Sequence, residues 1–260
     1  MAERDEAQTV AKRLHALLGG PEVTRKAAAR ELARRDPTDA TELIHHLLTL
    51  AREGWEPASC VLSSMVAALT LEAAEIPYAH ALRRLAEIQD LENVSAFLAE
   101  GPPKKEMNKG AAAKRDAQAF SDSLGHLKTK ARLTRDRDTL TKLLTVSHPD
   151  VIRNALLNPR LTEQTVVNTA ARRPSRPEPL WEIFKSEKWG VRHQIRRALV
   201  FNPYTPLELG AKLVPLLNET DLRELARDNN VHEAIRMQAE SLVESVTSRR
   251  RGEPPRGTIH

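Results

Sequence analysis

The stretch that decides the fold covers residues 151–162, which read VIRNALLNPRLT. The pattern returns 44 residues later at residues 195–206, which read IRRALVFNPYTP, and the two stretches align without a gap. Both hold Asn-Pro at the equivalent position. Asn tolerates the left-handed conformation that ends a helix, and Pro cannot continue one. Each stretch therefore predicts a helix that ends near Asn158 or Asn202.

The residues after these turns predict the start of the next helix, near Thr162 in the first copy and near Thr205 in the second. In the second copy Thr205 is the expected N-cap, Pro206 the first helical residue and Glu208 the third, which together make a capping box. Each copy is therefore expected to be a helix, a tight turn and a second helix.

A third partial copy covers residues 231–242, where Ile235-Arg236 lies 44 residues after Val191-Arg192. Copies at a fixed spacing predict a solenoid. The rest of the chain agrees, because apolar residues recur every three or four positions and Pro and Gly separate short segments. We therefore expect an all-α fold, an α-solenoid of antiparallel helix pairs. The expected parts are an N-terminal helical region 1–100, a basic linker and possible bridging helix 101–130, C-terminal HEAT-like repeats 131–247 and a disordered basic tail 248–260.

The repeated segments resemble a known class of helical repeats. Val191-Arg192 with Ala198-Leu199, and also residues 23–32, are similar to the second helix of HEAT-type repeats. Residues 158–162 and 202–206 resemble the related leucine-rich repeat variant of bacteria. The resemblance covers residues 138–247 well and residues 1–100 only loosely, and it implies a fold more than an activity. Some variant-repeat proteins carry an iron–sulfur domain, which the single cysteine, Cys60, excludes here.

Composition excludes several functional classes in this chain of 260 residues. Neither glycine-rich nucleotide-binding motif occurs, and Cys60 alone excludes internal disulfides and Cys-rich zinc sites. Cys60 lies in an apolar segment, so we expect a buried structural thiol. The nine histidines form no metal-binding pattern. We therefore expect no catalytic residue, no cofactor and no metal. No apolar run is long enough for a membrane span, and the charged segment after Met1 favours a cytoplasmic protein.

Charge is unevenly distributed. Residues 1–100 hold 11 Lys/Arg and 16 Asp/Glu, whereas residues 101–260 hold 29 and 19. A basic region attracts nucleic acid, an anionic membrane surface or an acidic protein, although Lys-rich linkers are usually solvated spacers. Weak nucleic-acid binding by the 101–260 half is therefore one hypothesis.

A cluster of aromatic and basic residues is the candidate partner-binding site. Trp189 precedes a predicted helix on which Val191, Ile195, Ala198 and Leu199 form the core stripe. The candidate residues are Trp189, Arg192, His193 and Arg196, because Trp and Arg are enriched in binding hot spots.

The alternative interpretation of this region is structural. It places Trp181 and Phe184 in the core and treats Arg192 and Arg236 as repeat arginines that pair with acids of the neighbouring unit. We favour it for Phe184 and Arg236, and leave Trp189 with Arg196 open.

The sequence thus predicts a non-enzymatic protein–protein interaction scaffold or adaptor of the helical-repeat type, with another protein as its partner. The alternative is a nucleic-acid-binding HEAT-like protein that uses the basic 101–260 half. Basic HEAT-like proteins include a bacterial DNA glycosylase family, but no motif here places its catalytic Asp. An enzyme of that type is therefore the less favoured hypothesis.

Overall fold

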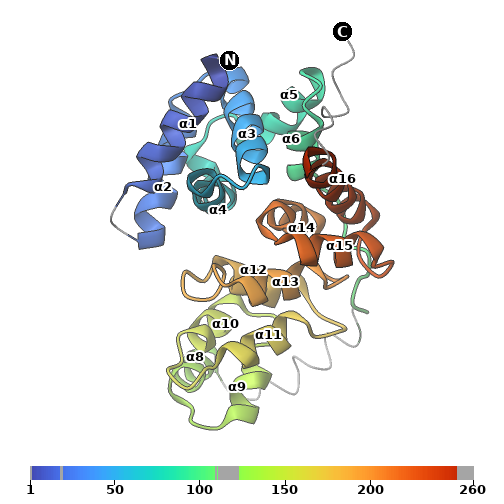
Figure 1. Cartoon of the computed structure of the whole chain (residues 1–260). Helices are drawn as coiled ribbons and strands as arrows, with labels where there is room; N and C mark the ends of the chain where they lie inside the picture. Colours follow the sequence, from blue (N-terminus) through green and yellow to red (C-terminus); the bar gives the residue numbers. More distant parts are fainter. Residues whose placement is uncertain (1, 18–19, 109, 111–122, 251–260) are drawn as a thin grey trace. The chain divides into compact units, whose positions relative to one another are not determined.

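The computed structural model describes residues 2–17, 20–108, 110 and 123–250. Every regular element in these residues is helical (Figure 1), so the all-α prediction is confirmed. The chain forms two compact units. Unit 1 comprises residues 1–100, 211–229 and 233–260, and unit 2 comprises residues 101–210 and 230–232.

Unit 1 is built around α4 (Glu56–Leu71), which packs against the three helices that precede it. The cause is a nearly continuous apolar face on α4, where Val61, Leu62, Met65 and Val66 are each at most 3% exposed. Asp36 is the N-cap of α3, because its carboxylate accepts from the Thr38 amide at 2.9 Å. Pro37 follows as the first helical residue, where no backbone N–H is needed. The helices of this unit are α1 (Ala2–His15), α2 (Gly20–Ala33), α3 (Pro37–Arg52), α4, α5 (Leu82–Ile88), α6 (Glu92–Phe97), α15 (Glu219–Arg227) and α16 (Glu233–Arg250), with short 3-10 turns η1 (Ala73–Glu75), η2 (Ala79–Ala81) and η3 (Val214–Leu216).

Unit 2 consists of shorter helices, and several pack against the next helix but one along the chain: α8 contacts α10, α10 contacts α12, and α11 contacts α13. Each buries one strongly apolar face, as Val151, Ile152, Ala155 and Leu156 do on α10. The helices are α8 (Leu124–Leu133), α9 (Arg137–Leu143), α10 (Pro149–Leu156), α11 (Glu163–Ala170), α12 (Pro177–Lys185), α13 (His193–Val200) and α14 (Leu207–Leu213), whose last three residues belong to unit 1.

The predicted helix ends are confirmed. Helices α10 and α13 each stop two residues before Asn158 and Asn202, and α11 begins directly after its N-cap Thr162. Helix α14 begins at Leu207, near the predicted start, but its capping box is wrong. The Thr205 hydroxyl donates to the Leu199 carbonyl at 2.6 Å, so it closes the turn behind it.

The reason for the conserved position of Asn within the two copies differs from the prediction. Among the described residues Asp90 is the only non-glycine with a positive φ, so neither asparagine is left-handed. Both side chains are instead buried and bridge two segments. Asn158 Nδ2 donates to the carbonyls of Ala131 (2.9 Å) and Thr134 (3.0 Å), and its Oδ1 accepts from the Arg160 amide at 2.8 Å.

Asn202 repeats this arrangement. Its Nδ2 donates to the carbonyls of Ala170 (2.6 Å) and Arg172 (3.1 Å), and its Oδ1 accepts from the Tyr204 amide at 3.0 Å. Asn is thus favoured at both turns, because one side-chain amide satisfies carbonyls at the end of an earlier helix, α8 for Asn158 and α11 for Asn202, and also accepts from an amide of its own turn. We name residues 158–160 the first Asn turn and residues 202–204 the second Asn turn.

The third copy has a different register. Val151, Ile195 and Ile235 are the third residues of α10, α13 and α16, and all are buried. Helix α13 begins 44 residues after α10, but α16 begins only 40 residues after α13, so Ile235 corresponds to Ile195. No Asn-Pro follows it. Helix α16 therefore continues for 18 residues, whereas α10 and α13 have eight each.

The number of helices in a copy and the grouping of the C-terminal segments also differ from the predicted organisation. Helix α12 lies between α11 and α13, so each complete copy holds three short helices and not a pair. Residues 211–229 and 233–247, predicted to belong with the repeats, group with residues 1–100. Within the predicted linker, residues 101–108 lie along unit 2, where the Lys105 amide donates to the Pro203 carbonyl at 2.9 Å. Positions 109, 111–122 and 251–260 lie outside the described residues.

Candidate functional site

The structure buries the tryptophan of the predicted partner site. Trp189 is 2% exposed, and its indole Nε1 donates to the Leu156 carbonyl at 2.9 Å. This bond satisfies a carbonyl at the end of α10, so the ring links α10 to the turn before α13. The indole is therefore part of the core of unit 2, and a partner has no direct access to it in this conformation.

Gly190 and Arg196 hold the same turn in place. A Cβ at Gly190 would lie 2.0 Å from the Phe184 carbonyl oxygen, so only glycine allows the backbone this close to the end of α12. The Gly190 carbonyl accepts from Arg196 Nε at 2.9 Å. Burial lowers the pKa of Arg196 to about 10, which is still high enough to keep the guanidinium charged at neutral pH.

The exposed members of this group are basic. Lys188 Nζ lies 4.3 Å and Arg192 Cζ 5.1 Å from the centre of the Trp189 ring. Arg192 also pairs with Glu163 of α11, as the structural alternative predicted for a repeat arginine. His193 is half-buried at the start of α13. The structure therefore brings the four predicted residues together, but only Arg192 is exposed.

Several neighbouring predictions need correction. Val191 is 46% exposed and is not a core residue, because it lies in the turn before α13 begins. Arg236 does not pair with an acid of a neighbouring repeat. Its guanidinium donates to Asn229 Oδ1 at 2.6 Å, and its nearest carboxylate is Glu233, on its own helix, at 4.0 Å. Phe184 is buried as predicted, whereas Cys60 is exposed and not buried, since it lies on the outer side of α4.

A surface that includes part of the basic region predicted from the sequence surrounds the first Asn turn. Asn158 holds Arg160 next to Thr134, in the loop after α8. The neighbouring segments carry further exposed arginines. We name this group cation cluster one: Arg132, Arg135, Arg137 and Arg160. None of their side chains forms an ion pair within the described part of the chain. Two exposed acids, Asp136 and Asp138, lie among them, and Asp136 caps α9 by accepting from the Thr139 amide.

An equivalent surface surrounds the second Asn turn. Asn202 joins Arg172 to Tyr204, and Pro203 accepts from the Lys105 amide. Cation cluster two comprises Lys104, Lys105, Arg172 and Arg173, all exposed. Arg173 Nη2 donates to the Phe201 carbonyl at 2.7 Å, and among the residues described here none of the four has an ion-pair partner. Glu106 is the one exposed acid in the adjoining segment 104–107.

The two clusters belong to a strongly basic unit. Unit 2 holds 21 Lys/Arg and 11 Asp/Glu, whereas unit 1 holds 19 and 24. Helix α11 connects the two Asn turns, since it starts after the first and ends at the carbonyls bound by Asn202. Its eight residues span about 12 Å at a rise of 1.5 Å each. Arginines beside a repeated Asn-Pro turn were the sequence signal for these clusters.

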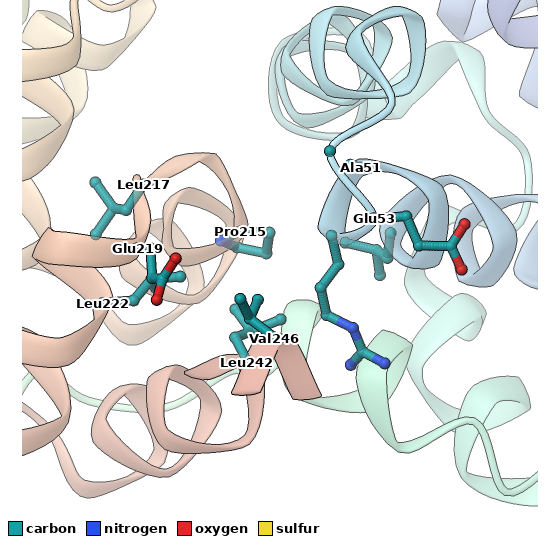
Figure 2. A pocket seen from close by; sticks show the side chains of 11 residues that line it. Ala51, Glu53, Pro215, Leu217, Glu219, Leu222, Leu242 and Val246 are labelled. Carbon is teal, nitrogen blue, oxygen red and sulfur yellow. The ribbon is translucent and has the colours of Figure 1, made fainter. Parts of the chain in front are cut away.

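Unit 1 contains a cavity of about 390 Å³ between the turn after α3 and the helices α15 and α16. Figure 2 shows Pro215, Leu242 and Val246 pointing toward its centre, with Ala51 on the opposite wall. The carboxylate of Glu53 points away from these residues and pairs with Arg4. The walls are mainly aliphatic, which suits an apolar group more than a charged ligand.

No group of three metal-ligating side chains occurs in the described ranges, and none of the helices there is both long and apolar enough to cross a membrane. Comparison with protein-family models, with curated proteins and with solved structures found no match. The chemistry of the site therefore depends on the two cation clusters and on the residues around Trp189.

Proposed function

We propose that this chain is a non-enzymatic helical-repeat protein of the α-solenoid type and that unit 2 binds nucleic acid. The observation that carries the proposal is the pair of cation clusters at the two Asn turns. Eight exposed Lys/Arg lie there, and none has an ion-pair partner among the described residues. Cations that gather without a compensating ion pair create a local positive potential, and its occurrence at two equivalent positions favours an external polyanion.

The geometry favours contact with phosphates. Six of the eight cations are arginines, whose planar guanidinium donates two parallel hydrogen bonds to a phosphate. The clusters lie at the two ends of α11, so they present positive charge at two points along one surface segment and not in one pocket. Such spacing suits a linear partner with a repeated negative charge.

The test is a fluorescence anisotropy titration of the full chain with a labelled mixed-sequence single strand and with a duplex. Two variants each replace four cations by glutamine, one in cluster one and one in cluster two. A matched control replaces four unit 1 cations, Lys12, Arg30, Arg84 and Arg227, which are likewise exposed and without an ion pair to a described residue.

We expect each cluster variant to bind at least about tenfold more weakly than the wild type at low salt, because it loses up to four phosphate contacts. The control variant should bind like the wild type. Equal losses of affinity in all three variants would mean that binding follows net charge alone, and would count against a specific surface. A wild-type protein that binds neither nucleic acid at low salt would overturn the proposal.

A second candidate is the protein-interaction scaffold, with the exposed side of the Trp189 group as its surface. The observation in its favour is that Lys188 and Arg192 remain exposed over a rigid, buried indole. An acidic protein segment would suit this surface. Capture of partners from a lysate with the wild type and with Arg192→Glu tests it, since loss of one defined protein with Arg192→Glu, but not with the cluster variants, would support the scaffold.

A further inference from the structure

The second Asn turn differs from the first at one position. The residue whose amide bonds to the asparagine Oδ1 is Arg160 in the first turn and Tyr204 in the second. The two positions are equivalent in sequence and in hydrogen bonding. The repeat therefore places an aromatic ring where the other copy places a cation.

Tyr204 lies among the backbones of cluster two. The Asn202 side chain bridges its amide to the Arg172 carbonyl, and Lys105 is bonded to the preceding residue, Pro203. The guanidinium of Arg173 is fixed on the Phe201 carbonyl, three residues before Tyr204. The segments that carry Lys105, Arg172 and Arg173 are thus all bonded to residues 201–203, directly before this tyrosine.

The two tyrosines of the chain are held differently. The Tyr78 hydroxyl donates to the Leu32 carbonyl, and burial raises the pKa of Tyr78. Tyr204 is half-buried, and its hydroxyl forms no hydrogen bond with any described residue. This hydroxyl is not among the buried polar atoms that lack a partner, so it reaches solvent. A half-buried tyrosine whose hydroxyl reaches solvent, in a turn whose backbone is bonded to segments that carry cations, offers a ring on which a nucleic-acid base can stack.

We infer that unit 2 prefers single-stranded nucleic acid, with the backbone on the cations of clusters one and two and an unpaired base on the ring of Tyr204. The inference rests on the proposed function. A duplex offers the same phosphates, but its bases are stacked on each other and do not reach the ring. Tyr204 would therefore contribute to binding a single strand and not a duplex.

The test compares Tyr204→Leu and Tyr204→Phe with the wild type, with a labelled oligothymidine and a duplex as probes. Leucine keeps an apolar side chain without a π-face, so single-strand affinity should fall roughly 5- to 150-fold, the range for loss of one stacked base. Phenylalanine keeps the ring and should retain wild-type affinity. Duplex affinity should be the same in all three proteins, and thermal melting checks that each is folded.

Unchanged single-strand binding by Tyr204→Leu would overturn this inference and leave the proposed function standing, provided that the wild type binds nucleic acid. Absence of any binding by the wild type would overturn both. If Tyr204→Leu does not fold, photocrosslinking of the wild type to a bromouridine-containing strand decides the matter. A crosslink on the peptide that contains Tyr204 is expected, and crosslinks found only on other peptides would contradict the inference.

Discussion

The arginines around Glu31 in unit 1 and the arginines near the two Asn turns in unit 2 are used in opposite ways. In unit 1 several arginines converge on acids that are mostly buried, some from the turn after the acid's own helix and some from another helix. Glu31, only 4% exposed, accepts from Arg13, Arg34 and Arg35, and Arg25 Nε pairs with Glu72 at 2.8 Å. In unit 2 the arginines near the Asn turns are exposed, and asparagine amides, not ion pairs, hold the helix ends together. Neutral hydrogen bonds thus hold these helix ends, which leaves the cations free to bind a partner.

The largest effect on stability is expected from Trp189→Ala. This substitution tests whether the packing of the unit 2 helices depends on the buried indole. The substitution leaves a large cavity and removes the bond to Leu156, so unfolding free energy should fall by about 3–5 kcal/mol. Urea unfolding followed by circular dichroism measures it. Trp189→Phe should cost less, because it keeps most of the buried volume. A stable Trp189→Ala protein would mean that the indole is not part of the core.

Asn202→Ala is expected to have the next largest effect. The change leaves the buried carbonyl of Ala170 and the partly buried carbonyl of Arg172 without their donor, which should cost about 2–3 kcal/mol of unfolding free energy. Asn158→Ala should cost a similar amount, since its bonds are equivalent. Denaturation of both variants checks this. A large loss in one and none in the other would contradict the equivalence of the two Asn turns.

In unit 1, Glu31→Gln tests whether the ion pairs of Glu31 stabilise the fold. Burial raises the pKa of Glu31, but hydrogen bonds from Arg35 and Arg34 and the charge of Arg13 lower it more, so the pKa lies below its ordinary value. Its stabilising effect is therefore present above the ordinary carboxyl pKa, about 4.3, and is lost as the pH falls through the lowered value. At pH 7 the variant should lose about 1–2 kcal/mol.

The pH dependence provides the control for Glu31→Gln. The difference in unfolding free energy between wild type and variant should shrink in acid, below the ordinary carboxyl pKa. Denaturant titrations at neutral and at acidic pH measure this difference. An unchanged difference in acid would show that the carboxylate charge is not what stabilises α1 and α2.

The smallest effect on stability is expected from the cluster variants themselves. Their eight side chains are exposed and have no ion-pair partner among the described residues, so the cluster-one and cluster-two substitutions should each change unfolding free energy by no more than about 0.5 kcal/mol. Cluster two includes Arg173, whose bond to Phe201 sets the upper end of that range. A loss of several kcal/mol in the cluster-one variant would mean that these arginines support the fold.

Local sequence was sufficient for the all-α class and for the helix ends near Asn158 and Asn202, because Pro and helical periodicity act over a few residues. It was insufficient where the deciding contact is distant. Trp189 appeared as a surface candidate, since its partner Leu156 lies 33 residues away. The side-chain bridge of Asn202 to Arg172 spans 30 residues, so the sequence suggested a backbone reason for Asn instead. The sequence predicted that the 101–260 half is basic, but not that its cations group at the two Asn turns, because the bonds of Asn158 and Asn202 that bring those segments together are also distant in sequence.

The most direct test of the central claim is the dependence of single-strand affinity on salt. Each phosphate contact contributes about 0.7 to the slope of log K against log salt concentration for a single strand. The account predicts that the cluster-one and the cluster-two variant each lower the wild-type slope by up to about 3, whereas the unit 1 control of Lys12, Arg30, Arg84 and Arg227 leaves it unchanged. Equal slopes for the wild type and both cluster variants would contradict the claim that unit 2 holds nucleic acid on these cations.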